Sequence, residues 1–108
     1  MKNLQRLDAK SLEERAMVIR RHIIRMLTRA GSGHPGSSLS TVDLLVALFY
    51  NKLRHNAQLP AWPDRDRFIL SKGHGCPALY AILAEMGYFN ADNLDTLRKF
   101  GSILQGHP

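Results

Sequence analysis

The first third of the chain has the hydrophobic spacing of an amphipathic helix. Ser11 is followed three residues later by Glu14, and this capping-box pairing satisfies free N–H groups at the start of a helix. Apolar side chains then recur at intervals of three and four residues, at Leu12, Ala16, Ile19, Ile23, Met26 and Ala30. Gly31 follows, and glycine is a typical helix terminator. The pattern predicts one helix over residues 11–30.

A glycine-rich loop and a second helix are predicted next. Residues 31–38 contain three glycines and a proline, a composition that favours a loop. Ser40 together with Asp43 is typical of a helix start, and residues 40–52 are apolar on nearly every side of the helix that would follow. We therefore expect a helix over residues 40–52 that is buried on more than one face.

The middle of the chain predicts a single strand followed by a helix. Residues 54–66 contain Pro60, Pro63 and many polar residues, which favour an irregular excursion. Residues 67–71, Arg-Phe-Ile-Leu-Ser, form a short apolar run typical of a strand buried on both faces. A Gly-His-Gly turn then leads into a helix that has Pro77 in its first turn and ends at Gly87. Strand, glycine turn and helix make half of a βαβ unit.

The C-terminal part predicts one more helix and an incomplete domain. Leu94, Leu97 and Phe100 are spaced by three residues, which indicates an amphipathic helix over residues 92–100. A single strand of the parallel type cannot form a sheet, because parallel strands need crossover partners. We therefore expect an α/β fold in which residues 1–108 are the N-terminal, incomplete portion of a parallel-sheet domain, mostly helical with one or two strands.

The formal net charge of +6 raises the question of nucleic-acid binding, because clustered basic residues attract phosphates. Five arginines lie between the apolar positions of the first predicted helix: Arg15, Arg20, Arg21, Arg25 and Arg29. A solvated helix face explains these arginines better than a DNA-binding face does. The aromatic residues are also not interleaved with basic ones as stacking platforms would be. Nucleic-acid binding remains an alternative, not the favoured prediction.

Cysteine content and hydropathy indicate the cellular compartment in which the chain is expected. Cys76 is the only cysteine, so no intrachain disulfide can form, and a reducing cytoplasm fits the chain best. No run approaches the roughly 18 apolar residues of a membrane span, and no targeting signal is visible at the N-terminus. We expect a cytoplasmic protein without a membrane partner.

Three histidines lie in glycine-bearing turns, and they are the candidates for chemistry: His34, His74 and His107. Glycine lets a ligand approach the main chain closely, and imidazole exchanges protons near neutral pH. For a single such turn, a locally hydrogen-bonded loop histidine is the better explanation. With three such turns in one chain, a functional role and a loop role are about equally well supported.

Other chemistries have less support in the sequence. The chain has no Cys-x-x-Cys or His-Glu-x-x-His pattern, so no metal site is predicted. Nucleophilic catalysis by Cys76 is disfavoured because its nearest histidine, His74, could not easily face the thiol from a turn two residues away. Ordinary packing of Cys76 at the start of a helix is the preferred interpretation.

Three segments resemble the transketolase family in order and spacing: Ser-Gly-His-Pro-Gly at residues 32–36, residues 64–75, and Gly-His-Pro at residues 106–108. The lysine of Ser-Lys-Gly-His-Gly is most similar to the N-terminal subunit of split transketolases, in which two chains form the enzyme. The resemblance covers about residues 11–108. It implies a thiamine-diphosphate-binding α/β domain that works as a dimer in the pentose phosphate pathway.

The resemblance also implies roles for the three histidines in moving a two-carbon ketol unit between sugar phosphates. His34 would handle the proton of the hydroxyl whose carbon–carbon bond breaks. His74, with Gly75, would lie near the cofactor diphosphate and the reaction centre. His107 would hydrogen-bond the hydroxyl of the transferred unit.

The departures from the family pattern limit what this chain is expected to do. The family binds Mg²⁺ and diphosphate through a Gly-Asp-Gly motif, which does not occur here, and a glutamate from another domain activates the cofactor. We therefore expect the chain alone to be inactive and to need a C-terminal transketolase subunit or pyrimidine-binding domain. Self-association is also expected. The alternatives are a non-catalytic interaction remnant, or a deoxyxylulose-phosphate or dihydroxyacetone synthase.

Overall fold

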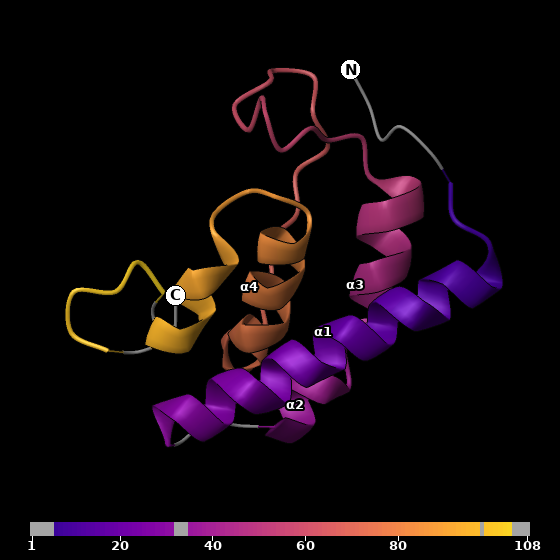
Figure 1. Ribbon diagram of the computed structural model, residues 1–108. Helices are drawn as coiled ribbons and strands as arrows, with labels where there is room; N and C mark the ends of the chain where they lie inside the picture. Colours follow the sequence, from indigo (N-terminus) through magenta and orange to yellow (C-terminus); the bar gives the residue numbers. More distant parts are fainter. Residues whose placement is uncertain (1–5, 32–34, 98, 105–108) are drawn as a thin grey trace.

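In the computed structural model, the described part of the chain comprises residues 6–31, 35–97 and 99–104. Its longest element is helix α1 (Ala9–Ala30), and the other helices pack along it (Figure 1). These are α2 (Pro35–Leu39), α3 (Val42–Ala47) with the π-helical turn η1 (Leu48–Lys52), the 3-10 turn η2 (Gly73–Gly75), α4 (Cys76–Glu85) and the 3-10 helix η3 (Ala91–Thr96). The described residues therefore form a helical layer.

Helix α1 ends where the sequence predicts but begins earlier. Asp8, not Ser11, is the N-cap: its carboxylate accepts the backbone N–H of Ser11 at 2.8 Å. This hydrogen bond lowers the pKa of Asp8 below its ordinary value. Gly31 closes the helix with φ of 73°, the left-handed conformation that favours glycine. The capping-box prediction was wrong because the helix already begins at Ala9, so Ser11 lies inside its first turn and donates its N–H to the Asp8 carboxylate.

The core lies where α1 meets α3, α4 and η3. Its fully or nearly buried members are Ala16, Ile19, Ile23 and Met26 from α1, Val42, Leu45 and Val46 from α3, Ala78, Ala81 and Ile82 from α4, and Leu94 and Leu97 near the C-terminus. The α1 residues are four of the six apolar positions whose spacing predicts that helix. Alanines on α4 let its backbone approach α1 closely.

The predicted helix over residues 40–52 is present in two parts. Residues 42–47 are α-helical, and η1 widens the last turn, with Leu53 donating its N–H to the carbonyl of Leu48 at 2.7 Å. Thr41 is the N-cap and makes no side-chain capping bond, so the Ser40 cap was wrong. Burial on more than one face is only partly confirmed, because Leu44 is 62% exposed.

The His55 side chain hydrogen-bonds to the π-helical turn η1. Its Nε2 lies 2.7 Å from the carbonyl oxygen of Phe49, and its Nδ1 lies against the hydroxyl of Tyr88. Because a carbonyl can only accept, we assign the proton to Nε2 and the acceptor role to Nδ1, to which Tyr88 donates. His55 is buried, and its ring stacks on Tyr88 and meets Phe49 edge-on. The His55 side chain thus links Phe49 of η1 to Tyr88 in the segment after α4.

The excursion over residues 54–66 is confirmed as irregular and is closed at its two ends. Asp66 donates its N–H to the carbonyl of Arg54 at 2.8 Å and accepts the N–H of Arg54 at 2.7 Å. The Arg54 guanidinium also lies 3.1 Å from the Asp66 carboxylate. These bonds lower the pKa of Asp66 and raise that of Arg54. The pair holds the loop ends together.

Three predicted elements differ in the structure. The strand over residues 67–71 is not formed, because no second strand pairs with it within the described residues. Residues 35–38 of the predicted loop belong to α2, since Pro35 suits a first helical turn. The helix over residues 92–100 is instead the shorter η3, capped by the Asn90 side chain. The helix with Pro77 in its first turn, and Gly87 with φ of 92° after it, is confirmed.

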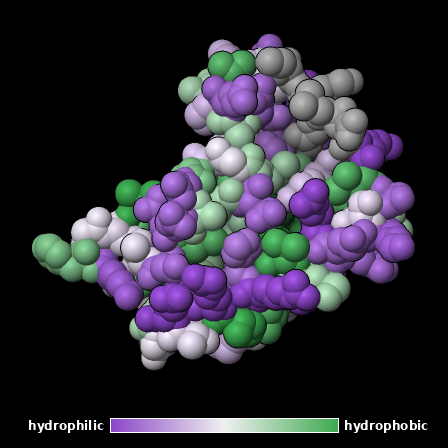
Figure 2. Space-filling view, in the orientation of Figure 1, coloured by the Kyte–Doolittle hydropathy of each residue, from purple (hydrophilic) through white to green (hydrophobic). Residues whose placement is uncertain are grey.

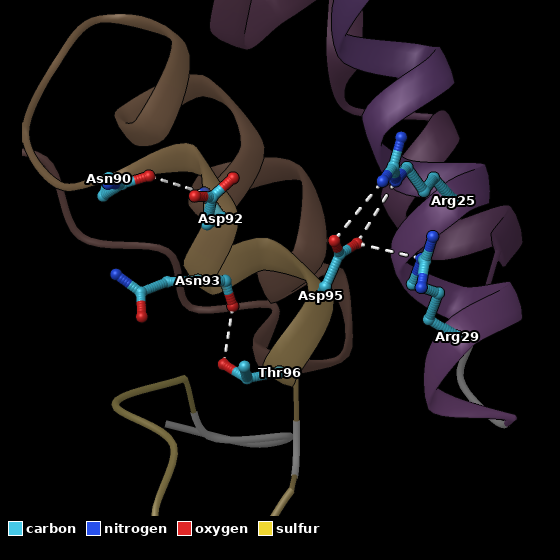
Figure 3. Close-up of polar contacts among 7 residues, drawn as sticks. All are labelled: Arg25, Arg29, Asn90, Asp92, Asn93, Asp95 and Thr96. Carbon is cyan, nitrogen blue, oxygen red and sulfur yellow. Dashed lines mark hydrogen bonds and ion pairs between the residues drawn. The ribbon is translucent and has the colours of Figure 1, made fainter.

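Most arginines of α1 pair with acidic side chains of neighbouring elements. Asp95 of η3 points between Arg25 and Arg29, at 3.2 Å from each (Figure 3). Arg20 lies 2.9 Å from Asp43, and Arg15 lies 3.8 Å from Glu85. Figure 2 shows a largely hydrophilic surface along this side of the molecule. Intramolecular ion pairing at a solvated helix face therefore accounts for four of the five arginines.

No helix in the described ranges is both long enough and apolar enough to cross a membrane.

Candidate cofactor and substrate site

His74 lies in the turn that delivers the chain into α4. Gly73, His74 and Gly75 form η2, and Cys76 is the first residue of the ten-residue helix. The backbone of Gly73 and Gly75 is buried, whereas the His74 residue is exposed. Gly75 is the N-cap of α4 and carries no side chain that could cap it. Cys76, Pro77 and Ala78 of the first turn are buried, and the N–H of Cys76 donates to the carbonyl of Gly73. The exposed side chains beside this end of α4 are those of Lys72 and His74.

Helix α2 lies directly against this turn. A Cβ placed on Gly75 would lie 3.4 Å from the carbonyl oxygen of Ser37, so the two backbones are almost in contact. Lys72 Nζ donates to Ser40 Oγ at 2.8 Å, and Ser40 Oγ in turn donates to the Ser37 carbonyl at 3.1 Å. The segment that follows His34 is thus fixed to the turn that carries His74.

His34 and His107 lie outside the described residues. The structure therefore places one of the three predicted histidines, His74, together with the predicted cofactor-binding Gly75. Pro35, next to His34, begins α2, which contacts η2. The residues that follow His34 in the sequence therefore lie close to the turn that carries His74, while the roles of all three histidines remain predictions.

The electrostatics of the turn favour an anion. The N-terminus of α4 carries a partial positive charge from aligned peptide dipoles. Lys72 adds a full positive charge, and its side chain is exposed. From the sequence, Lys72 indicated only a resemblance to a family, and Ser40 was predicted to cap a helix. A lysine next to a Gly-His-Gly turn before a helix was the signal for an anion site.

Two other side chains at the site are buried. Cys76 is fully buried at the start of α4, which confirms the prediction that it packs there. Ser38 is also fully buried, and its hydroxyl has no hydrogen-bond partner in the described part of the chain. Across the same residues, no group of three His, Cys, Asp or Glu side chains is close enough together to hold a metal ion. The described residues thus offer an anion site without a metal cluster.

Comparison with known proteins gives the family context. The family described as "Transketolase, thiamine diphosphate binding domain" matches residues 12–108. A 6-deoxy-6-sulfo-D-fructose transketolase subunit from a Clostridium species is 46% identical over 96 residues, covering 89% of this chain and 35% of that protein. Human transketolase is 44% identical over 104 residues, covering 96% of this chain and 16% of that protein.

Solved structures give the same result for the fold. Transketolase from Leishmania mexicana superposes with a TM-score of 0.86 at 35% identity, covering 96% of this chain and 15% of that one. Transketolase from Campylobacter jejuni gives a TM-score of 0.85 at 35% identity, covering 94% and 16%. The described helices thus have the arrangement found in one part of these larger chains. The present chain spans about a third of the Clostridium subunit and about a sixth of the human enzyme.

Proposed function

Because the chain belongs to the transketolase thiamine diphosphate binding domain family, we propose that it supplies part of the cofactor and substrate site of a transketolase. The reaction is transfer of a two-carbon ketol unit from a ketose phosphate to an aldose phosphate. The observation that carries this proposal is the glycine turn at the N-terminus of α4, held against α2 beside Lys72 and His74. The family match, the positive end of the α4 dipole and the exposed Lys72 beside it favour a diphosphate there.

The residues of the turn fit the cofactor's anionic end. Thiamine diphosphate, when bound, supplies a nucleophilic carbon that accepts the two-carbon unit. Here Gly75 lets the backbone of α2 approach the turn closely, and the exposed Lys72 offers a positive charge. His74 would lie near the diphosphate and the reaction centre, where its imidazole could hydrogen-bond or exchange a proton. The Gly-Asp-Gly motif through which the family binds Mg²⁺ does not occur in this chain, so we assign the Mg²⁺ ligands to the remaining part of the enzyme.

His34 and His107 would act on the substrate. His34 accepts and returns the proton of the hydroxyl at the breaking carbon–carbon bond, a task suited to neutral imidazole. His107 hydrogen-bonds the hydroxyl of the transferred unit. The position of α2 against η2 supports the assignment of His34 to the same site as His74.

The working enzyme needs more polypeptide than these 108 residues. We assign the missing parts to a C-terminal transketolase subunit or a pyrimidine-binding domain, in a cytoplasmic dimer. The split relative, which is named as a subunit, supports this division. Calorimetric titration of the isolated chain with thiamine diphosphate and Mg²⁺ tests the proposal. We expect no ketol transfer and no binding at micromolar concentration; micromolar binding would show that the site is complete within the chain.

A second candidate substrate is a sulfonated sugar. The relative with 46% identity is named for 6-deoxy-6-sulfo-D-fructose, and a sulfonate is, like phosphate, an anionic terminal group. Comparing kcat/KM of the complete enzyme for fructose 6-phosphate and for 6-deoxy-6-sulfofructose distinguishes the two substrates. The sugar-phosphate assignment requires the higher value for fructose 6-phosphate.

A further inference from the structure

The chain that leads to His107 runs through a loop between two buried leucines. We call the described residues of this segment, 97 and 99–104, the Ser102 loop. Leu97 and Leu104 are 2% and 3% exposed and belong to the core. Between them, the side chains of Phe100 and Ile103 are exposed. Because these two apolar side chains face solvent, their packing does not fix the shape of the loop, and its polar contacts become decisive.

A chain of hydrogen bonds crosses the Ser102 loop. The N–H of Leu104 donates to Ser102 Oγ at 2.9 Å, and Ser102 Oγ lies 2.7 Å from Thr96 Oγ1. Thr96 Oγ1 donates to the carbonyl of Asn93 at 2.6 Å (Figure 3). Because a hydroxyl has one proton and that of Thr96 is used on Asn93, we assign Ser102 as the donor to Thr96. The bonds thus form one directed chain from Leu104 to η3, in which each bond strengthens the next.

Helix η3, on which this hydrogen-bond chain ends, is anchored on α1. Leu94 of η3 is buried in the core. Asp95 points between Arg25 and Arg29 of α1, at 3.2 Å from each (Figure 3). Exposed ion pairs stabilise weakly, so burial of Leu94 supplies most of the anchoring energy and the ion pairs orient η3. The Ser102 loop is therefore tied to α1 through η3.

Backbone bonds complete the closure of the loop. The N–H of Lys99 donates to the carbonyl of Thr96 at 2.9 Å, and the N–H of Ser102 donates to the carbonyl of Lys99 at 3.0 Å. Gly101 has a φ of 81°, a conformation that lets the chain turn just before Ser102. Ser102 thus takes part through both its N–H and its hydroxyl. The closure depends on this residue more than on any other of the loop.

The short distance in sequence from Leu104 to His107 makes the closure important for the histidine. Three residues separate the two positions by at most about 11 Å of extended chain. Leu104 is held both by burial of its side chain and by the bond from its N–H to Ser102. The chain therefore enters the Gly-His-Pro segment from a fixed point.

We propose that Ser102 and Thr96 are positioning residues for His107 in ketol transfer. Their paired hydroxyls fix the backbone at Leu104, and that fixed point directs His107 to the hydroxyl of the transferred two-carbon unit. Neither Ser102 nor Thr96 touches the substrate. The inference rests on the proposed role of His107 and goes beyond it, because it assigns the placement of that histidine to two hydroxyl groups elsewhere in the chain.

The test removes the Ser102 hydroxyl in the complete enzyme, with His107 present and absent. Ser102→Ala should lower kcat/KM for ketol transfer about tenfold. This is less than the roughly 100-fold loss that a misplacement of about 1 Å can cause, because burial still holds Leu104. The dissociation constant of thiamine diphosphate should not change. In the His107→Ala background, Ser102→Ala should have little further effect, since no imidazole is left to position. Ser102→Thr keeps a hydroxyl and should retain most of the activity.

A matched pair of threonine variants tests the second hydroxyl. Thr96→Val keeps the β-branched shape and removes the hydroxyl, so it should lower kcat/KM as Ser102→Ala does. Thr28 is exposed on α1, and its hydroxyl makes no hydrogen bond to a described residue. Thr28→Val should therefore have the kcat/KM of the unaltered enzyme. Equal activities of the two valine variants would overturn the proposal.

The outcomes separate this inference from the proposed role of His107. An equal loss from Ser102→Ala with and without His107, or weakened cofactor binding, would overturn the inference, because Ser102 would then stabilise the domain in general. Unchanged transfer in Ser102→Ala beside a loss in His107→Ala would overturn the inference and keep the role of His107. Unchanged transfer in His107→Ala would overturn both.

Hydrogen exchange on the unaltered complete enzyme covers the case in which Ser102→Ala fails to fold. The N–H of Ile103 makes no hydrogen bond to a described residue, whereas that of Leu104 donates to Ser102. The Leu104 amide should exchange about tenfold more slowly than the Ile103 amide, or more slowly still. Equal rates would overturn the proposal, because the loop would then not be closed at Leu104. Thr96→Val then replaces Ser102→Ala in the comparison with His107→Ala.

Discussion

The ammonium nitrogen of Lys72 lies 2.8 Å from the hydroxyl oxygen of Ser40, although the two residues are 32 positions apart in the sequence. Ser40 in turn donates to the carbonyl of Ser37, whose oxygen almost touches the Gly75 backbone. One short chain of contacts therefore joins the segment after His34 to the turn that carries His74. A diphosphate bound at the N-terminus of α4 would meet both segments at once.

The positive charge of Lys72 should contribute to cofactor affinity. In the complete enzyme, Lys72→Met should weaken thiamine diphosphate about tenfold, which corresponds to about 1.4 kcal/mol, and should reduce the dependence of binding on salt. Arg21→Met is the control, since Arg21 is exposed on α1 and makes no ion pair with a described residue. Calorimetry at two salt concentrations measures both effects. Equal affinities for the two variants would remove Lys72 from the site.

Gly31 should be required for its backbone conformation alone. Its φ of 73° is strained for any residue with a Cβ, and no atom of a described residue lies within 4 Å of the position that a Cβ would take. Gly31→Ala should therefore lower the free energy of unfolding by about 1 kcal/mol. Gly36→Ala, inside α2 and also without a neighbour within 4 Å, should be neutral or stabilising. Urea denaturation of both variants checks this, and an equal loss from each would contradict it.

His55 should stabilise the fold through the carbonyl of Phe49. Removing the imidazole by His55→Ala leaves that acceptor without its partner and opens a space beside Tyr88. We expect a loss of about 1–3 kcal/mol in the free energy of unfolding. Tyr88→Phe removes only one hydroxyl and should cost less, about 1 kcal/mol. Denaturant titration measures both changes, and a larger cost for Tyr88→Phe would contradict the assigned roles.

Acid should destabilise the loop over residues 54–66 through Asp66. The folded-state pKa of Asp66 lies below its ordinary value of 3.8, because its carboxylate accepts bonds from Arg54. Its stabilising contribution is therefore present above the unfolded pKa and is lost as pH falls from about 4 through the folded pKa. Asp66→Asn should reduce the dependence of the free energy of unfolding on pH between about pH 4 and pH 2. Glu13→Gln, at an exposed carboxylate of α1, is the control and should retain the slope.

The elements that local sequence determines were predicted well. Helix α1 and its end at Gly31 follow from apolar spacing and from a residue that tolerates positive φ, and α4 follows from Pro77 and Gly87 in the same way. Both helices satisfy their own backbone bonds. Their existence therefore needs no information from distant parts of the chain.

The features that depend on distant partners were not predicted. Residues 67–71 have the composition of a strand, but a strand forms only when another strand accepts its backbone bonds. In η1 the carbonyl of Phe49 accepts a bond from His55, and Lys72 donates to Ser40; both contacts join residues that sequence patterns do not pair. Asp8 and Ser11 both have side chains that can cap a helix, and the sequence alone does not decide between them. In the structure the cap is Asp8.

The assignment of His74 to the cofactor is tested most directly by His74→Ala in the complete enzyme, meaning this chain joined to the remaining transketolase sequence. His34→Ala and His107→Ala serve as comparisons, because we assign those residues to the substrate. For each variant, the dissociation constant of thiamine diphosphate is measured in the presence of Mg²⁺, followed by ketol transfer at saturating cofactor. We predict that His74→Ala weakens the cofactor and slows transfer. The other two variants should keep the cofactor affinity and lose about 10²- to 10⁴-fold in kcat/KM. Unchanged cofactor binding and unchanged transfer in all three variants would contradict the account, because the histidines would then be ordinary loop residues.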